Sequence, residues 1–127
     1  MHDAEVRDAQ PYILVVEDEF LIRLMLCECL REAGYHVIEA RDADEALLML
    51  NLSLPDLVIS DVQMPGSLDG MGLLSLVKTS HPNVPVIVAS GHFPETTALA
   101  AGADHFVSKP YSYDLMLKIT HSILTRT

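Results

Sequence analysis

Apolar residues follow two different spacings along this chain. Five short runs are mostly apolar and rich in large or β-branched residues, as in strands that are buried in a sheet, and the second of them is weaker. These runs are 12–16, 36–40, 57–60, 84–89 and 105–108. The segments between them place apolar residues three or four positions apart, which is typical of amphipathic helices. The predicted helices are 20–33, 43–54, 70–80, 95–101 and a last one that follows Ser112.

The alternation of strands and helices predicts the architecture. Each strand and its following helix have the length of a βα repeat, and such repeats place the strands in a parallel sheet with helices on both faces. We therefore predict an α/β fold, a doubly wound five-stranded parallel sheet with five helices. With 127 residues, half of them apolar, the chain is long enough for one domain with a single core. We expect a polar N-terminal extension at 1–10 and one domain at 11–127.

Single residues predict where helices begin and end and which faces are buried. Asp42 and Ser112 are typical helix N-caps, and Gly34 is a typical C-terminal stop. The expected inner face of the first helix consists of Ile22, Leu26, Cys29, Leu30 and Ala33. The expected inner stripe of the last helix consists of Leu115, Ile119 and Ile123.

Cys27 and Cys29 lie two residues apart on the first predicted helix. Side chains at that spacing do not face each other, so neither a disulfide between them nor a zinc pair is expected. We predict two reduced thiols, with Cys29 directed toward the core.

The charge of the chain argues against one large class of function. The formal net charge is -10, and the eight Lys and Arg residues are scattered. Binding to nucleic-acid phosphates requires clustered basic side chains, so direct nucleic-acid binding is not expected. The first ten residues are polar, and no apolar run has membrane-spanning length, so we expect a cytoplasmic protein without a membrane contact.

Polar side chains follow four of the predicted strands. Glu17 and Asp18 come after the first strand, Asp61 ends the third, Ser90 the fourth, and Lys109 follows the fifth. In a doubly wound sheet these loops open on the same edge, which is where such folds bind ligands. Three carboxylates this close together do not all ionise cheaply unless a cation neutralises them, so a divalent metal is implied. Oxygen ligands with room for water and phosphate oxygens suit Mg2+.

Each of these residues taken alone also has an ordinary interpretation. Asp61 can be a turn former or a helix cap, and the Glu17-Asp18 pair can be the acidic start of the next helix. Lys109 can be a surface charge and Ser90 a loop hydroxyl. Their combination at four separate strand ends favours phosphoryl chemistry.

The sequence resembles the receiver domain of two-component response regulators, from Tyr12 to Leu124. Five motifs that coincide in order with predicted strand ends carry the resemblance: 15–19 (VVEDE), 58–65 (VISDVQMP), 69–70 (DG), 86–91 (VIVASG) and 106–110 (FVSKP). The resemblance implies a flavodoxin-like receiver fold.

The resemblance also implies roles for individual residues. Asp61 would be the phosphoacceptor, taking a phosphoryl group from a histidine of a partner kinase. Asp18, Asp61 and the backbone carbonyl of Gln63 would bind Mg2+ directly, and Glu17 would act mainly through a water. The transferring group carries negative charge on three oxygens, so catalysis is mostly positioning and charge stabilisation, to which Lys109 contributes.

A conformational switch and a cis peptide bond follow from the same resemblance. Ser90 would donate a hydrogen bond to the phosphoryl group and move toward it, and the rotamer of the Phe106 ring would follow. The Lys109-Pro110 peptide is cis in the family.

The sequence departs from the family pattern in three places. Glu17 stands where many relatives have Asp, and Phe106 lacks the hydroxyl that a Tyr would carry. The segment 66–68 is one residue longer than the commonest version. Gln63 and His92 flank the site and are candidates for influencing how fast water removes the phosphoryl group.

Three other functions compete with this interpretation. A flavodoxin-like electron carrier shares the architecture, but Glu17, Asp18 and Glu19 would repel a flavin phosphate. A Mg2+-dependent aspartyl-phosphate phosphatase of the haloacid dehalogenase type needs a second Asp two residues after the nucleophile, where this chain has Gln63. A non-phosphorylated docking module does not require the acids, Ser90 and Lys109.

The partners expected from the resemblance are proteins. The phosphodonor would be a sensor histidine kinase or a phosphotransfer protein, and the chain is expected to be a stand-alone regulator that contacts an unknown downstream protein. We expect the changing surface on the helix after Ser90, the strand of Phe106 and the last helix, where a homodimer could form. Candidates for this surface are Phe93, Ala98, Ala101, His105, Tyr111 and Tyr113.

Overall fold

A computed structural model describes residues 10–64, 66 and 68–125 of the chain. Five parallel strands form one sheet in the order β2-β1-β3-β4-β5. The strands are β1 (Tyr12–Val16), β2 (His36–Ala40), β3 (Leu57–Asp61), β4 (Val86–Ser90) and β5 (His105–Ser108). The helices are α2 (Phe20–Glu32), α3 (Ala43–Leu52), α4 (Gly70–Ser80), α5 (Glu95–Ala100) and α6 (Tyr113–Leu124). The predicted doubly wound α/β fold is therefore confirmed.

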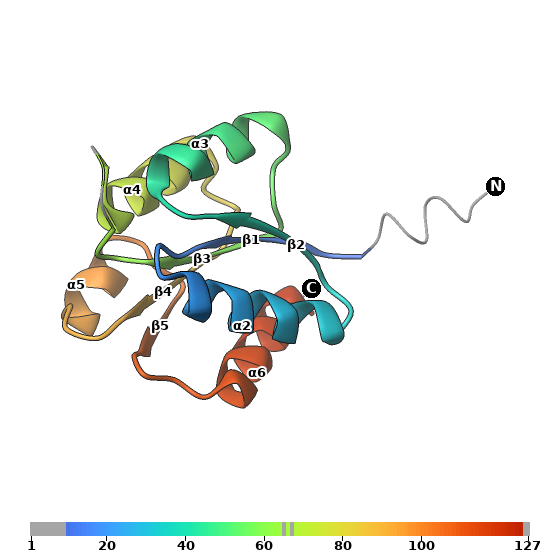
Figure 1. Cartoon of the computed structure of the whole chain (residues 1–127). Helices are drawn as coiled ribbons and strands as arrows, with labels where there is room; N and C mark the ends of the chain where they lie inside the picture. The colour runs from blue at the N-terminus through green and yellow to red at the C-terminus, as the bar shows by residue number, and fades with distance from the viewer. Residues whose placement is uncertain (1–9, 65, 67, 126–127) are drawn as a thin grey trace.

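The sheet separates two hydrophobic cores, because alternate residues of each strand point to opposite faces. Leu14 and Val58 pack on the face covered by α3, α4 and α5 (Figure 1). Ile13 and Ile59 pack on the face covered by α2 and α6. Burial of β1, β3 and β4 on both faces explains their continuously apolar sequences, whereas the edge strands β2 and β5 are more exposed and carry polar residues.

Local signals placed most element boundaries correctly. The Asp42 side chain accepts from the Glu45 N–H at 2.8 Å, and the Ser112 hydroxyl accepts from the Leu115 N–H at 3.0 Å, so both predicted N-caps are confirmed. The helix expected to reach residue 54 ends at Leu52. The fourth strand begins at Val86 rather than at residue 84, because Pro85 has no N–H to donate to the ladder.

The predicted inner face of α2 is partly wrong. Cys27 is fully buried and Cys29 only half-buried, whereas we expected Cys29 to face the core. One turn before Cys27, the guanidinium of Arg23 donates to the Glu17 carbonyl at 2.7 Å and to the Glu39 carboxylate at 3.1 Å. A polar residue thus occupies part of the inner face, which apolar spacing alone does not reveal. Burial raises the pKa of the Cys27 thiol to about 12, so this thiol stays protonated at neutral pH.

The predicted inner stripe of α6 is also partly wrong. Leu115 is 46% exposed, and the fully buried side chains are Met116 and Thr120. Ile119 and Ile123 are partly buried against the core, as expected. Met116 and Thr120 are four residues apart and lie on the same inner face of α6. Because Thr120 is polar, apolar spacing does not reveal this face.

Candidate functional site

Three carboxylates meet at the carboxyl edge of the sheet. Glu17, Asp18 and Asp61 offer oxygen atoms that all lie within 4.8 Å of one another. They converge because β1 and β3 are neighbours, with Val16 paired to Ser60, so that the acids follow adjacent strand ends. Glu17 is only 4% exposed, whereas Asp18 faces solvent. The predicted convergence of the acids is confirmed.

Lys109 reaches the same cluster from the loop after β5. Its Nζ lies 2.8 Å from Glu17 Oε1 and 3.2 Å from Asp61 Oδ2. The Lys109-Pro110 peptide is cis, as the resemblance implied. One ammonium against three carboxylates leaves two negative charges at the site when all of them are ionised.

Burial and the neighbouring charges both shift the pKa values of Glu17 and Lys109. Burial raises the pKa of the Glu17 carboxyl, hydrogen bonds from Lys109 and the Glu19 N–H lower it, and Asp61 raises it, with a net increase. Burial alone would lower the pKa of Lys109, but its contacts with Glu17 and Asp61 raise it above its ordinary value. The lysine therefore stays charged, and ionised Glu17 is disfavoured in the absence of a further cation.

Replacing Glu17 with Gln is expected to stabilise the metal-free chain increasingly as pH rises. The folded-state pKa of Glu17 is raised, so its stabilising contribution is complete below the ordinary value of about 4.3 and is lost as pH rises through the folded pKa. Gln imitates the protonated form at every pH. Urea unfolding in EDTA between about pH 4 and pH 7 should show that the free energy of unfolding of the variant, relative to that of the wild type, increases with pH. A constant difference between the two proteins over this range would contradict the raised pKa.

The backbone of Asp61 is held by the start of α4. Asp61 Oδ1 accepts from the Val62 N–H at 2.7 Å, and the Val62 carbonyl accepts from the Gly70 N–H at 2.8 Å. A Cβ atom on Gly70 would lie 1.9 Å from the Asp61 carbonyl oxygen. The Asp69 side chain caps α4 by accepting from the Gly72 N–H at 2.9 Å. Asp69 and Gly70 therefore position the acid rather than take part in the chemistry.

Gly70→Ala is expected to displace Asp61 and to lower the free energy of unfolding by roughly 2–3 kcal/mol, within the range for overpacked sites. The matched control is Gly72→Ala, whose Cβ would meet the flexible end of the Leu68 side chain. Gly72 lies within α4, where Ala is the better helix former by up to about 1 kcal/mol, so this variant should be nearly neutral. Urea unfolding of both variants tests the prediction. Equal stabilities of the two variants would contradict it.

Ser90 and Phe106, the two residues of the switch interpretation, lie on β4 and β5. Ser90 ends β4, is 3% exposed, and accepts from the Phe93 N–H at 3.3 Å through its hydroxyl oxygen. Residue 89, next to Ser90, is paired with Asp61 across the β3-β4 ladder. Phe106 is half-buried on β5 and packs against the same core as Phe93. The Ser90 hydroxyl thus contacts the backbone of Phe93, whose ring packs against the same core as the Phe106 ring.

The other residues singled out in the sequence lie around the site or away from it. Gln63 and His92 are exposed beside the site. Of the lengthened loop segment 66–68, residue 67 lies outside the described residues. Ala98 is fully buried, so its proposed place on a changing surface is wrong.

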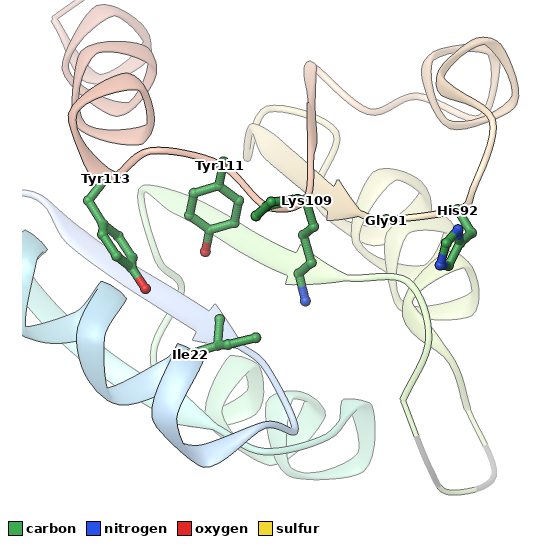
Figure 2. A pocket seen from close by; sticks show the side chains of 7 residues that line it. Ile22, Gly91, His92, Lys109, Tyr111 and Tyr113 are labelled. Atoms are coloured by element: carbon green, nitrogen blue, oxygen red, sulfur yellow. The ribbon is translucent and has the colours of Figure 1, made fainter.

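A cavity beside the acids was not predicted from the sequence. It has a volume of about 450 Å3 and is lined by Ile22, Gly91, His92, Lys109, Pro110, Tyr111 and Tyr113. Figure 2 shows the side chains of Lys109, Tyr111 and Tyr113 along it; Tyr111 lies between β5 and α6, and Tyr113 begins α6. The sequence predicts the two tyrosines only as part of a changing surface. The cavity combines three segments that are far apart in the sequence, and no local pattern indicates it.

This parallel sheet, with three acids and a lysine at its carboxyl edge, defines a receiver-type α/β domain. The family model described as "Response regulator receiver domain" matches residues 13–121, so the chain belongs to the response regulator receiver family of two-component signal transduction. The fold is the flavodoxin-like receiver fold.

Individual relatives agree with the family. The nitrogen assimilation regulatory protein NtrX of Azorhizobium caulinodans is 41% identical over 116 residues, which are 88% of this chain and 26% of that protein. The crystal structure of the receiver domain of NtrX from Brucella abortus has a TM-score of 0.85 at 36% identity and covers 91% of this chain and 99% of its own. The chemotaxis response regulator CheY4 of Vibrio cholerae has a TM-score of 0.82 at 28% identity and covers 90% of this chain and 98% of its own.

The chain spans 26% of the length of the Azorhizobium NtrX protein and between 23% and 52% of the length of eight curated relatives that include it. Among the described helices, none has the length and apolar character needed to cross a lipid bilayer.

Proposed function

We propose that this chain accepts a phosphoryl group on Asp61 from the phosphohistidine of a sensor kinase or phosphotransfer protein, in a Mg2+-dependent reaction. The observation that carries the proposal is the meeting of three carboxylates with Lys109 at one edge of the sheet. Charge stabilisation and positioning are the main requirements of phosphoryl transfer, and this cluster can supply both.

The donor set fits Mg2+. All three acidic residues offer oxygen, which hard cations prefer, and the cluster keeps two negative charges after pairing with Lys109. Asp18, Asp61 and the Gln63 carbonyl would hold the ion directly, with Glu17 acting through a water. When bound, the ion would supply positive charge to the phosphoryl oxygens and so lower the repulsion between the donor and the acids.

Three residues of the chain would act directly on the phosphoryl group. A carboxylate oxygen of Asp61 forms the new P–O bond while the P–N bond of the donor breaks, and the imidazole leaves with the electron pair. The Lys109 ammonium, already 3.2 Å from Asp61 Oδ2, stabilises negative charge on the transferred group. The Ser90 hydroxyl accepts from Phe93 and keeps its own hydrogen, so it can donate to a phosphoryl oxygen.

The output would leave through the surface of α5, β5 and α6. Movement of Ser90 toward the phosphoryl group would weaken its contact with Phe93. Phe93 lies two residues before α5 and packs in one core with Phe106. Ala101 and His105 are exposed on this surface. A dimer through the β5 and α6 face, or contact with a downstream protein, is expected to strengthen with a beryllofluoride phosphoryl mimic. Unchanged size and partner affinity with the mimic would exclude this output.

The phosphodonor would approach over α2. Phe20, Leu21 and Met25 are each more than half exposed. They lie in the first two turns of α2, which begins two residues after Asp18, so exposed apolar side chains lie near the negatively charged site. A partner whose histidine lies on an amphipathic helix fits this surface, because burying its apolar face would bring the histidine to Asp61.

The experiment that tests the proposed function is incubation with acetyl phosphate and Mg2+, followed by intact-mass measurement. One added phosphoryl group per chain is expected, and none after EDTA treatment. Continuous release of inorganic phosphate at many turnovers per minute, without a labelled species, would favour the phosphatase alternative. Absence of both label and turnover would favour the docking module.

A further inference from the structure

Two arginines of α2 make the same two kinds of contact. The Arg23 guanidinium donates to the Glu39 carboxylate at 3.1 Å and to the Glu17 carbonyl at 2.7 Å. The Arg31 guanidinium donates to the same carboxylate at 3.1 Å and to the Val37 carbonyl at 3.0 Å. The two side chains differ in the carbonyl that they hold. That of Arg23 belongs to an acid of the site, and that of Arg31 belongs to the edge strand β2.

The contact from Arg23 fixes the backbone that carries Glu17 and Asp18. The Glu17 carbonyl and the Asp18 N–H belong to one planar peptide unit, so holding the carbonyl oxygen also fixes the direction in which the chain enters Asp18. The Glu17 N–H donates to the Ala40 carbonyl at 3.0 Å, which holds the preceding peptide unit on β2. Asp18 is exposed, so the placement of its carboxylate depends mainly on this backbone.

The Glu17 side chain depends on the same backbone. Its Oε2 accepts from the Glu19 N–H at 3.1 Å, and its Oε1 accepts from the Lys109 ammonium at 2.8 Å. The Glu19 carbonyl accepts from the Arg23 N–H at 3.0 Å. Arg23 therefore holds the segment 17–19 through its backbone and through its guanidinium, and this segment places the carboxylates of both acids.

The Arg23 guanidinium is shielded from solvent and charge-balanced. Its side chain is 14% exposed, and its guanidinium carbon lies 5.6 Å from the centroid of the Phe20 ring. Glu39 supplies the negative charge that a shielded cation needs. Shielding from water strengthens a charge-assisted hydrogen bond. Arg23 is therefore held in one position against the Glu17 carbonyl.

We propose that Arg23 is a positioning residue for the metal-binding acids, and that its hydrogen bond to the Glu17 carbonyl raises the affinity of the site for Mg2+. This role rests on the proposed function, in which Asp18 binds the ion directly and Glu17 acts through a water. Residues behind the direct ligands of a metal commonly hold those ligands in the geometry that the metal requires. Arg23 acts through the backbone of the two acids and contacts neither the ion nor the phosphoryl group.

Electrostatics alone predicts the opposite effect of removing Arg23. Its guanidinium is a cation within hydrogen-bonding distance of the Glu17 carbonyl, so its loss makes the site more negative and strengthens the attraction for a divalent cation. Loss of positioning weakens Mg2+ binding instead. The sign of the change in Mg2+ affinity therefore distinguishes the two roles.

The test titrates MgCl2 into the isotope-labelled wild type, Arg23→Gln and Arg31→Gln, and follows the amide signals of Asp18 and Val62. The half-saturating Mg2+ concentration should rise about tenfold in Arg23→Gln, at the lower end of the effect of residues behind metal ligands. It should be unchanged in Arg31→Gln, which loses one positive charge and an equivalent contact with Glu39. Urea unfolding of both variants measures the loss of stability, which a merely structural role would produce without a change in Mg2+ affinity.

A second measurement uses the wild-type chain and does not depend on folding of the variants. Mg2+ should shift the Arg23 Nε–H signal with the same half-saturating concentration as the Asp18 amide, and should leave the Arg31 Nε–H signal in place. An unchanged or lower half-saturating concentration in Arg23→Gln, an equal rise in Arg31→Gln, or an Arg23 signal that does not respond to Mg2+ would each overturn the positioning role. Failure of the proposed function is a different result, namely a wild-type chain that acetyl phosphate does not label at saturating Mg2+.

Discussion

Asp61→Asn is expected to abolish phosphoryl acceptance from any donor. Its carboxylate is the only proposed nucleophile, and an amide oxygen does not form a stable acyl phosphate at neutral pH. The loss should exceed about a thousandfold, comparable with removal of a nucleophile in other covalent mechanisms. Intact mass after incubation with acetyl phosphate and Mg2+ measures the labelled fraction.

The matched control is Asp56→Asn. Asp56 is an exposed acid whose carboxylate accepts from the Tyr12 N–H at 2.8 Å, a contact that an Asn oxygen can also make. This variant should be labelled like the wild type. Asp61→Asn itself should fold well, because it removes one of three crowded acids. A labelled Asp61→Asn protein would place the chemistry elsewhere.

Lys109→Met is expected to have the second largest effect. The side chain of Lys109 is 19% exposed and contacts both Glu17 and Asp61, so its removal leaves two acids without their cation. We expect a loss of about 2 kcal/mol of unfolding free energy in EDTA, below the 3–5 kcal/mol typical of fully buried pairs. Labelling should slow by roughly a hundredfold, as for removal of one charge-stabilising group.

Added Mg2+ distinguishes the contribution of Lys109 to stability from its contribution to the rate of labelling. Added Mg2+ should restore part of the stability lost in Lys109→Met, because it supplies positive charge to the same acids, but should leave labelling slow. Lys118→Met, which removes an exposed lysine of α6, controls for the loss of one charge. Urea unfolding with and without Mg2+ provides the comparison. A Lys109→Met protein labelled at the wild-type rate would contradict the role assigned to this lysine.

The sequence predicted features that depend on local chemistry or on fixed topology. Strands buried on both faces, the caps at Asp42 and Ser112, and the stop at Gly34 each follow from the residues themselves. The meeting of Glu17 with Asp61 follows from parallel strands, whose carboxyl ends share one edge.

The features that were missed depend on packing between distant segments. Arg23 and Thr120 are polar residues on inward faces, so apolar spacing assigned the wrong side to Cys29 and Leu115. Gly70 was recognised as part of a motif, but the requirement for glycine arises from the approach of α4 to the Asp61 backbone. The cavity at Tyr111 likewise exists only after α2 and the loops after β4 and β5 have come together.

The most direct test of the account is chemical localisation of the phosphoryl group. After labelling with acetyl phosphate and Mg2+, borohydride reduction converts an aspartyl phosphate to homoserine, and peptide mass spectrometry identifies the residue. The account predicts homoserine at position 61 and at no other acid. Homoserine at another acid, or phosphate that survives on a histidine or serine peptide while residue 61 remains Asp, would contradict it.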